Sequence, residues 1–134
     1  MKKFRLLIAT LLCALTTTFV SCNFVSDAIN NSITNTWVYS EDFGSYTIYY
    51  IYEFYYDDTY TYEEWQVNNN GGEKTNYYAY GTYDFSNYYE TLTLFRNYPS
   101  YATIQMDAYI SSGVLNLKEL YDDGYYYWTR YYKN

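Results

Sequence analysis

YTIYYIYEFYYDDTYTYEEW, residues 46–65, carries eight tyrosines in twenty positions and decides the fold class. Aromatic and β-branched residues, which favour strands, fill most of the stretch. Asp57, Asp58 and Thr59 interrupt it with residue types that are typical of a turn. The stretch therefore predicts a β-hairpin with arms at 46–56 and 59–67, rather than a disordered low-complexity tract.

The first arm of this hairpin is apolar or aromatic on both faces except at Glu53. Successive residues of a strand point to opposite sides, so alternate positions share a face. One face must line the core, and the other is either covered or free for binding. The two sets are Tyr49, Ile51 and Tyr55 on one face, and Ile48, Tyr50, Tyr52 and Phe54 on the other.

The chain downstream of residue 35 has strand-forming composition throughout, and turn residues divide it at short, regular intervals. Alternation of apolar and polar residues, as at Leu92 and Leu94 or Leu115 and Leu117, indicates strands with one buried face. Short connections favour pairing of sequential strands, and closure removes exposed edges. We expect an all-β fold, an antiparallel meander closing into a small barrel of about eight strands. The expected strand segments are 36–40, 46–56, 59–67, 73–80, 82–86, 89–95, 101–110, 114–120 and 125–132.

The N-terminal residues 1–22 have the order of regions found in a secretory signal, in which three basic residues precede an apolar run over 6–15. Ser21 then precedes Cys22, which resembles the lipobox of bacterial lipoproteins. The resemblance implies that residues 1–21 are a signal peptide and that Cys22 carries acyl chains such as palmitate. Those chains would anchor the protein in the bacterial cell envelope, at the outer membrane. An ordinary soluble secretory signal is the alternative.

The remaining chain divides into a tether and one domain. Residues 22–35, the lipidated cysteine and a polar, aperiodic stretch, fit a flexible tether. Residues 36–134 fit a single barrel domain.

Charge and composition exclude several classes of function. Without residues 1–21, five basic residues stand against fifteen acidic ones, a net charge of −10 that disfavours nucleic acid as a partner. The chain has no histidine, which removes the usual general base and a common metal ligand. We therefore expect no enzyme activity, no cofactor and no metal site.

Three pairs of adjacent carboxylates raise the alternative of glycosidase-type chemistry. Neighbours along a strand point to opposite faces, as expected for Glu63 and Glu64. Asp57-Asp58 and Asp122-Asp123 lie beside threonine or glycine and indicate turns. A structural role is the favoured interpretation for all three pairs.

The barrel domain resembles the bacterial lipocalin-like lipoproteins. The stretches that carry this resemblance are NTWVYS at 35–40, YEFYYDDTYTYEEW at 52–65, GTYDF at 81–85, SSGVLNL at 111–117 and YYYWTRYY at 125–132. In the lipocalin pattern a tryptophan on the first strand is covered by an arginine near the end of the chain. The resemblance implies that Trp37 and Arg130 form this pair and close one end of the barrel.

Two binding functions follow from these features. In the first, which the resemblance implies, the barrel of a monomer encloses a small apolar or amphipathic ligand. In the second, the barrel is filled, and aromatic residues on its outer surface recognise a glycan or a protein partner. The candidate contacts are Tyr49, Tyr50, Tyr52, Phe54, Tyr55 and Trp65.

Overall fold

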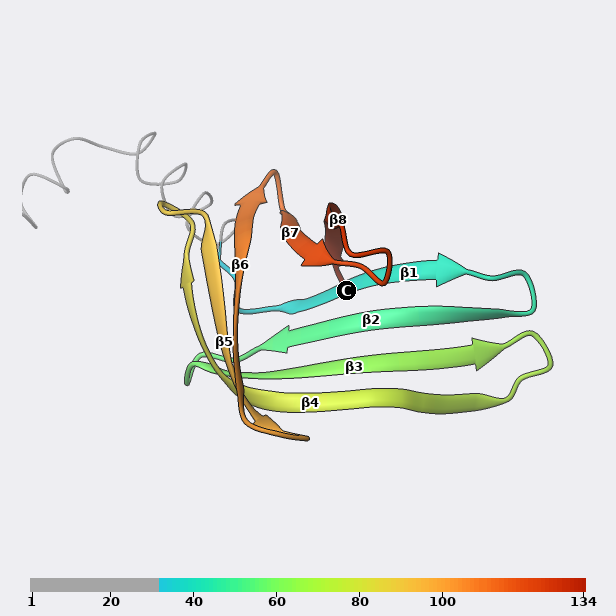
Figure 1. The fold of residues 1–134 in the computed structure, drawn as a ribbon. Coiled ribbons are helices and arrows are strands. Elements are labelled where there is room, and N and C mark those ends of the chain that lie inside the picture. Colours follow the sequence, from blue (N-terminus) through green and yellow to red (C-terminus); the bar gives the residue numbers. More distant parts are fainter. Residues whose placement is uncertain (1–31) are drawn as a thin grey trace, which may run out of the picture. The chain divides into compact units, whose positions relative to one another are not determined.

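The computed structural model of the protein describes residues 32–134, which form a closed antiparallel barrel of eight strands (Figure 1). Each strand pairs with the next one in the chain, and β8 returns to pair with β1. The predicted all-β meander and its closure are confirmed, and the architecture is consistent with a small lipocalin-like barrel. The strands are β1 (Thr36–Asp42), β2 (Tyr46–Phe54), β3 (Thr59–Asn68), β4 (Glu73–Ser86), β5 (Thr91–Tyr98), β6 (Ala102–Ser111), β7 (Val114–Leu120) and β8 (Tyr126–Lys133).

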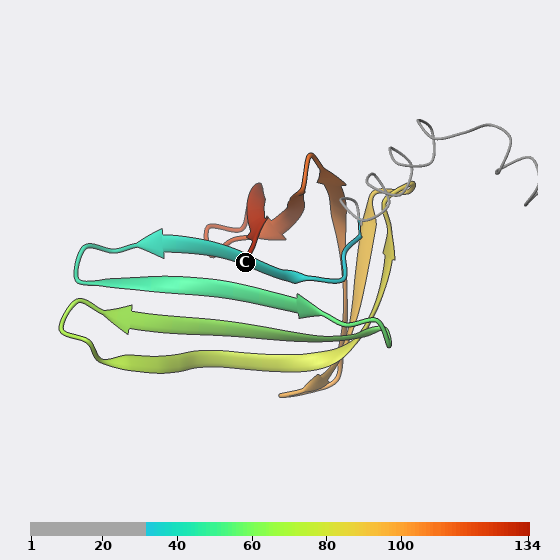
Figure 2. The same cartoon turned by 180° about the vertical axis from the view of Figure 1, so that it is seen from behind.

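The barrel closes over a short seam. β1 pairs with β2 along its whole length, but it pairs with β8 only at Trp37↔Lys133 and Val38↔Tyr132. In Figures 1 and 2, β1–β4 lie side by side as long strands, while β5 and β6 rise steeply across one end of them. The pairing of β8 with β1 ends at Val38. Past this residue, the inner faces of β1, β2 and β3 face the β7–β8 connection across an open space.

One expected break in the chain is wrong. The segments 73–80 and 82–86 form the single strand β4, which runs through Gly81. The pairing with β5 shifts by a bulge between Tyr80 and Gly81, and a Cβ on Gly81 would collide with the Phe95 carbonyl. Glycine here permits close backbone approach inside a strand, which is its other common role besides ending one.

The end of the barrel opposite the opening is filled by side chains. Buried residues from different strands meet there, among them Trp37, Phe54, Leu92 and Leu115. The alternation predicted for β5 is confirmed, since Leu92 and Leu94 are buried and their neighbours are not. In β7 the predicted Leu115 and Leu117 are buried, but Asn116 between them is buried too.

The barrel unit begins before the predicted boundary at residue 36. Ile33 is buried in the core, and the Trp37 indole Nε1 donates a hydrogen bond to the Ile33 carbonyl at 2.7 Å. The Phe54 amide donates to the Asn35 carbonyl at 3.0 Å. Residues 33–35 are therefore part of the folded unit, and the tether predicted over 22–35 extends too far.

The predicted signal peptide, residues 1–21, and the predicted lipidation site Cys22 lie outside the described residues. Within residues 32–134, no helix is long and apolar enough to span a membrane.

Candidate functional site

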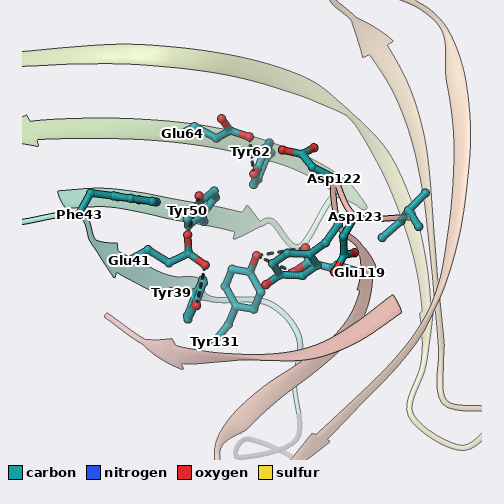
Figure 3. A pocket seen from close by; sticks show the side chains of 12 residues that line it. Tyr39, Glu41, Phe43, Tyr50, Tyr62, Glu64, Glu119, Asp122, Asp123 and Tyr131 are labelled. Atoms are coloured by element: carbon teal, nitrogen blue, oxygen red, sulfur yellow. Dashed lines mark hydrogen bonds between the residues drawn. The ribbon is translucent and has the colours of Figure 1, made fainter. Parts of the chain in front are cut away.

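A cavity of about 640 Å³, the mouth cavity, occupies the open end of the barrel, or mouth. Its walls come from β1, β2 and β3 on one side and from β7, β8 and their connection on the other (Figure 3). This is the volume typical of a small-molecule site. The lining residues are Tyr39, Glu41, Phe43, Tyr50, Tyr62, Glu64, Glu119, Leu120, Tyr121, Asp122, Asp123 and Tyr131.

Tyrosine and glutamate alternate along two strands that line this cavity. Tyr39 and Glu41 on β1, and Tyr62 and Glu64 on β3, are two residues apart and so share the inner face. In each pair the phenol hydroxyl donates a hydrogen bond to the carboxylate at 2.9 Å. The pattern thus places two carboxylates in the mouth, each held in position by a neighbouring ring.

Pairing of β1 with β2 adds a second ring to the Glu41 carboxylate. Tyr50 lies opposite Tyr39 in the register, and the two rings stack with centroids 5.7 Å apart. The Tyr50 hydroxyl donates to Glu41 Oε2 at 3.3 Å, while Tyr39 donates to Oε1. Both oxygens of Glu41 therefore accept a hydrogen bond, and the hydroxyls of two stacked rings hold its carboxylate in place.

Glu119 on β7 provides the third carboxylate from the far side of the cavity. Tyr131 on β8 donates to both of its oxygens at 3.1 Å. Burial raises the pKa of the Glu119 carboxyl, and hydrogen bonds from Thr129, Tyr131 and Tyr52 oppose that shift. Figure 3 shows Glu41, Glu64 and Glu119 directed into the same space from three different strands.

The tyrosines around these carboxylates are neutral hydrogen-bond donors. Burial, reinforced by the hydrogen bond to Glu41, raises the pKa of Tyr39 to about 12. Burial and the nearby carboxylates also raise the pKa of Tyr50, Tyr62 and Tyr131. A phenolate beside a glutamate would be doubly disfavoured, so the rings keep their protons across the physiological range.

The negative charge of this cavity has no basic counterpart in its walls. Five carboxylates and no lysine or arginine line it. Among residues 32–134 one ion pair forms, between Lys118 and Asp107 at 3.2 Å, and both side chains are exposed elsewhere on the surface. A concave site lined by one sign of charge concentrates ions of the other sign.

The carboxylates are spread around the cavity instead of converging on a point. No group of three acidic, cysteine or histidine residues within residues 32–134 is close enough together to hold one metal ion. The three glutamates of the cavity come from three different strands, β1, β3 and β7.

No protein-family model matches the chain, and no curated protein or solved structure is detectably similar to it. The geometry of the barrel and its mouth is therefore the basis for assigning a function.

The six predicted contact residues divide between the inside and the outside of the barrel. Tyr50 lines the mouth cavity, Tyr52 is buried deeper in the interior, and Phe54 belongs to the filled end. The two faces predicted for β2 are thus correct. Tyr49 and Tyr55 occupy the outer face, where the Tyr49 ring packs against Trp65 at 5.8 Å.

The predicted barrel-closing pair is half wrong. Trp37 is fully buried at the filled end, as expected. Arg130 is exposed, because it alternates with the buried Thr129 and Tyr131 and so faces outward. The cation over the Trp37 ring is instead Lys133, with Nζ 5.5 Å from the centroid, since the register of β1 and β8 places these two residues opposite each other.

The three acidic pairs take the strand and turn positions that were predicted, but residues of two of these pairs also line the mouth cavity. Glu64 lines the mouth while Glu63 lies on the outer face, where it accepts a hydrogen bond from Thr75. Asp122 and Asp123 form the turn before β8 and also line the cavity.

Sequence reasoning missed Glu41, Glu64 and Glu119 as site residues. The usable signal was Tyr-x-Glu, which occurs at 39–41, ending one residue past the expected strand 36–40, and at 62–64 within the expected strand 59–67. The pattern also occurs at 88–90, which does not line the cavity.

Proposed function

We propose that the barrel binds a small organic cation that also carries an apolar group, and that it does so in the mouth cavity. The observation that carries this proposal is the lining of the cavity: tyrosine rings and five carboxylates, with no basic residue. The sequence led us to expect an amphipathic ligand, and the proposal adds that the polar group of this ligand is positively charged.

Both kinds of wall favour such a ligand. A desolvated cation over an aromatic face gains about 0.5–2 kcal/mol, and Tyr39, Tyr50, Tyr62 and Tyr131 surround the space. A protonated amine can also donate hydrogen bonds to the glutamates, in charge-assisted contacts that are stronger than neutral ones. The ring edges and Phe43 would cover the apolar part of the ligand.

The proposal includes the role of a lipid-anchored binding protein without catalytic activity. Its support is the lipobox-like Ser21-Cys22 and the lack of histidine in the chain. When expressed in a bacterium, the Cys22→Ala variant should be found in the soluble fraction instead of the membrane fraction. Unchanged membrane association would contradict the anchor without affecting the ligand proposal.

Three probes of nearly equal size and different charge test the ligand class. Phenethylamine is a cation, phenethyl alcohol is neutral and phenylacetate is an anion. In calorimetric titrations the amine should bind tightest and phenylacetate weakest, and the amine affinity should fall with added salt. Equal affinities, or a preference for phenylacetate, would contradict a cation site.

A second candidate function rests on aromatic residues outside the barrel. Tyr78, Tyr80 and Tyr98 are exposed by 41%, 45% and 48%, and the rings of Tyr80 and Tyr98 are nearly parallel at 5.6 Å. Exposed rings of this kind suit stacking on a sugar. Glycan-array binding that is lost in Tyr80→Ser/Tyr98→Ser, with phenethylamine binding unchanged, would favour this surface. This second function was expected together with a filled barrel, and the mouth cavity shows that the barrel is not filled throughout. The outer surface itself is not affected by that difference.

A further inference from the structure

A second cavity, of about 210 Å³, lies inside the barrel and shares Tyr62 with the mouth cavity. Its other walls come from β2 to β6, and neither β7 nor β8 contributes a residue. The lining residues are Tyr52, Tyr60, Tyr62, Tyr77, Ala79, Leu94, Arg96 and Ile104. It contains no carboxylate, so its chemistry differs from that of the mouth.

Arg96 is the charged residue of this second cavity, and neutral oxygens hold it in place. Its Nε donates to the Ser100 carbonyl at 2.9 Å, its Nη2 donates to Ser100 Oγ at 3.1 Å, and its Nη1 donates to the Tyr77 hydroxyl at 3.0 Å. A guanidinium has five N–H donors. Two of them, one on each terminal nitrogen, therefore have no protein acceptor within residues 32–134.

The positive charge of Arg96 acts on the barrel interior. Burial raises the pKa of Tyr60 to about 12, and the Arg96 charge opposes this shift. Tyr60 is almost fully buried at the wall of the second cavity. An anionic group placed there would meet a fixed cation, while the alkyl and ring surfaces of Ala79, Leu94 and Tyr52 would surround its apolar neighbours.

We infer that the ligand is dipolar, with a protonated amine in the mouth cavity, an apolar segment passing Tyr62, and a carboxylate or similar anionic group at Arg96. This inference rests on the proposed function and adds the second end of the ligand. The two cavities share Tyr62 in their walls and carry opposite charge, and each has side chains already oriented by hydrogen bonds. A guanidinium with two free, preoriented donors is suited to bidentate contact with a carboxylate.

Two matched series of probes test the inference on the wild-type protein. The first series is hexylamine, octylamine and decylamine. The second is the ω-amino acids aminohexanoate, aminooctanoate and aminodecanoate, which carry the amine at one end of the chain and the carboxylate at the other. If a chain spans both cavities, the amino acid of that length should bind about tenfold more tightly than the amine of the same length. The comparison needs no variant, so it holds even if a substitution at Arg96 unfolds the barrel.

The matched variants are Arg96→Met and Lys118→Met. Each removes one positive charge, but Lys118 is exposed on the outer surface in its ion pair with Asp107. Arg96→Met should abolish the advantage of the amino acids over the amines of the same length, and Lys118→Met should preserve it.

The outcomes separate the inference from the proposal beneath it. If alkylamines bind and no amino acid of any length binds more tightly, the dipolar ligand is overturned and the cation site stands. An advantage that persists in Arg96→Met also overturns it. If neither series binds, the cation site itself fails and this inference fails with it.

Discussion

Glu64→Gln is the most informative single change in the mouth, because its neighbour provides the control. The substitution removes one negative charge and keeps the shape of the side chain. Glu64 lines the cavity, where the Tyr62 hydroxyl holds it at 2.9 Å. Glu63 has the same charge one residue earlier in the chain, but it lies on the outer face beside Thr75.

The size of the effect follows from Coulomb attraction in a half-open cavity. A unit charge pair at 4 Å is worth about 4 kcal/mol near a protein surface and about 1 kcal/mol in bulk water. The mouth is open to solvent on one side, so about 1–2 kcal/mol is reasonable, a loss of about five- to thirtyfold in affinity. Solvent screens Glu63 from the cavity, and Glu63→Gln should change the affinity by less than about twofold.

Calorimetric titration with phenethylamine at low and high salt measures both variants, and phenethyl alcohol serves as the uncharged reference. Glu64→Gln should weaken amine binding, reduce its salt dependence and leave the alcohol unaffected. Equal losses in the two variants would show that only the net charge of the protein matters. No loss in Glu64→Gln would refute the assigned site.

Three further predictions concern stability. Because burial raises the pKa of Glu119, the carboxyl group of Glu119 binds its proton more tightly in the folded protein than in the unfolded chain. The free energy of unfolding should therefore fall as the pH rises from the usual pKa of glutamate toward the raised pKa of Glu119. Glu119→Gln should remove this decline and be the more stable protein at neutral pH, as chemical denaturation across the pH range would show; an unchanged profile would contradict the burial of this carboxyl. Lys133→Met should lower the free energy of unfolding by about 0.5–1 kcal/mol and lose this effect in a Trp37→Leu background, which has no aromatic ring, whereas Arg130→Met should be neutral. A cost at Arg130 and none at Lys133 would favour the pair predicted from the sequence. Gly81→Ala should cost about 1–3 kcal/mol in thermal or chemical unfolding because its Cβ meets the backbone of the next strand, and a neutral result would contradict that contact.

Much of the fold could be predicted because it rests on local patterns. The hairpin around Asp57-Asp58 was predictable from turn chemistry, and Asp58 does adopt a left-handed backbone with φ of 61°. The faces of β2 were predictable from its period of two. Gly81 was misread because the sequence does not distinguish a glycine that ends a strand from one that lets two backbones approach.

The site was harder to predict because it is assembled from residues distant in the chain. Tyr-x-Glu on β1 and on β3 places a ring and a carboxylate on one face, but does not reveal whether that face is inside. Glu119 is separated from these pairs by more than fifty residues. Its approach depends on β4, β5 and β6, which carry the chain around the barrel from β3 to β7.

The sequence by itself determined the strands, their turns and the sets of residues that share a face, because these depend on neighbours a few positions apart. Only the tertiary structure decided which aromatic face of β2 points inward, that Lys133 and not Arg130 covers Trp37, and that the short β1–β8 seam leaves one end open. Those outcomes depend on strand register and barrel closure. A change of one residue in register would exchange every inner and outer side chain, so the binding site is a property of the closed barrel and not of any single strand.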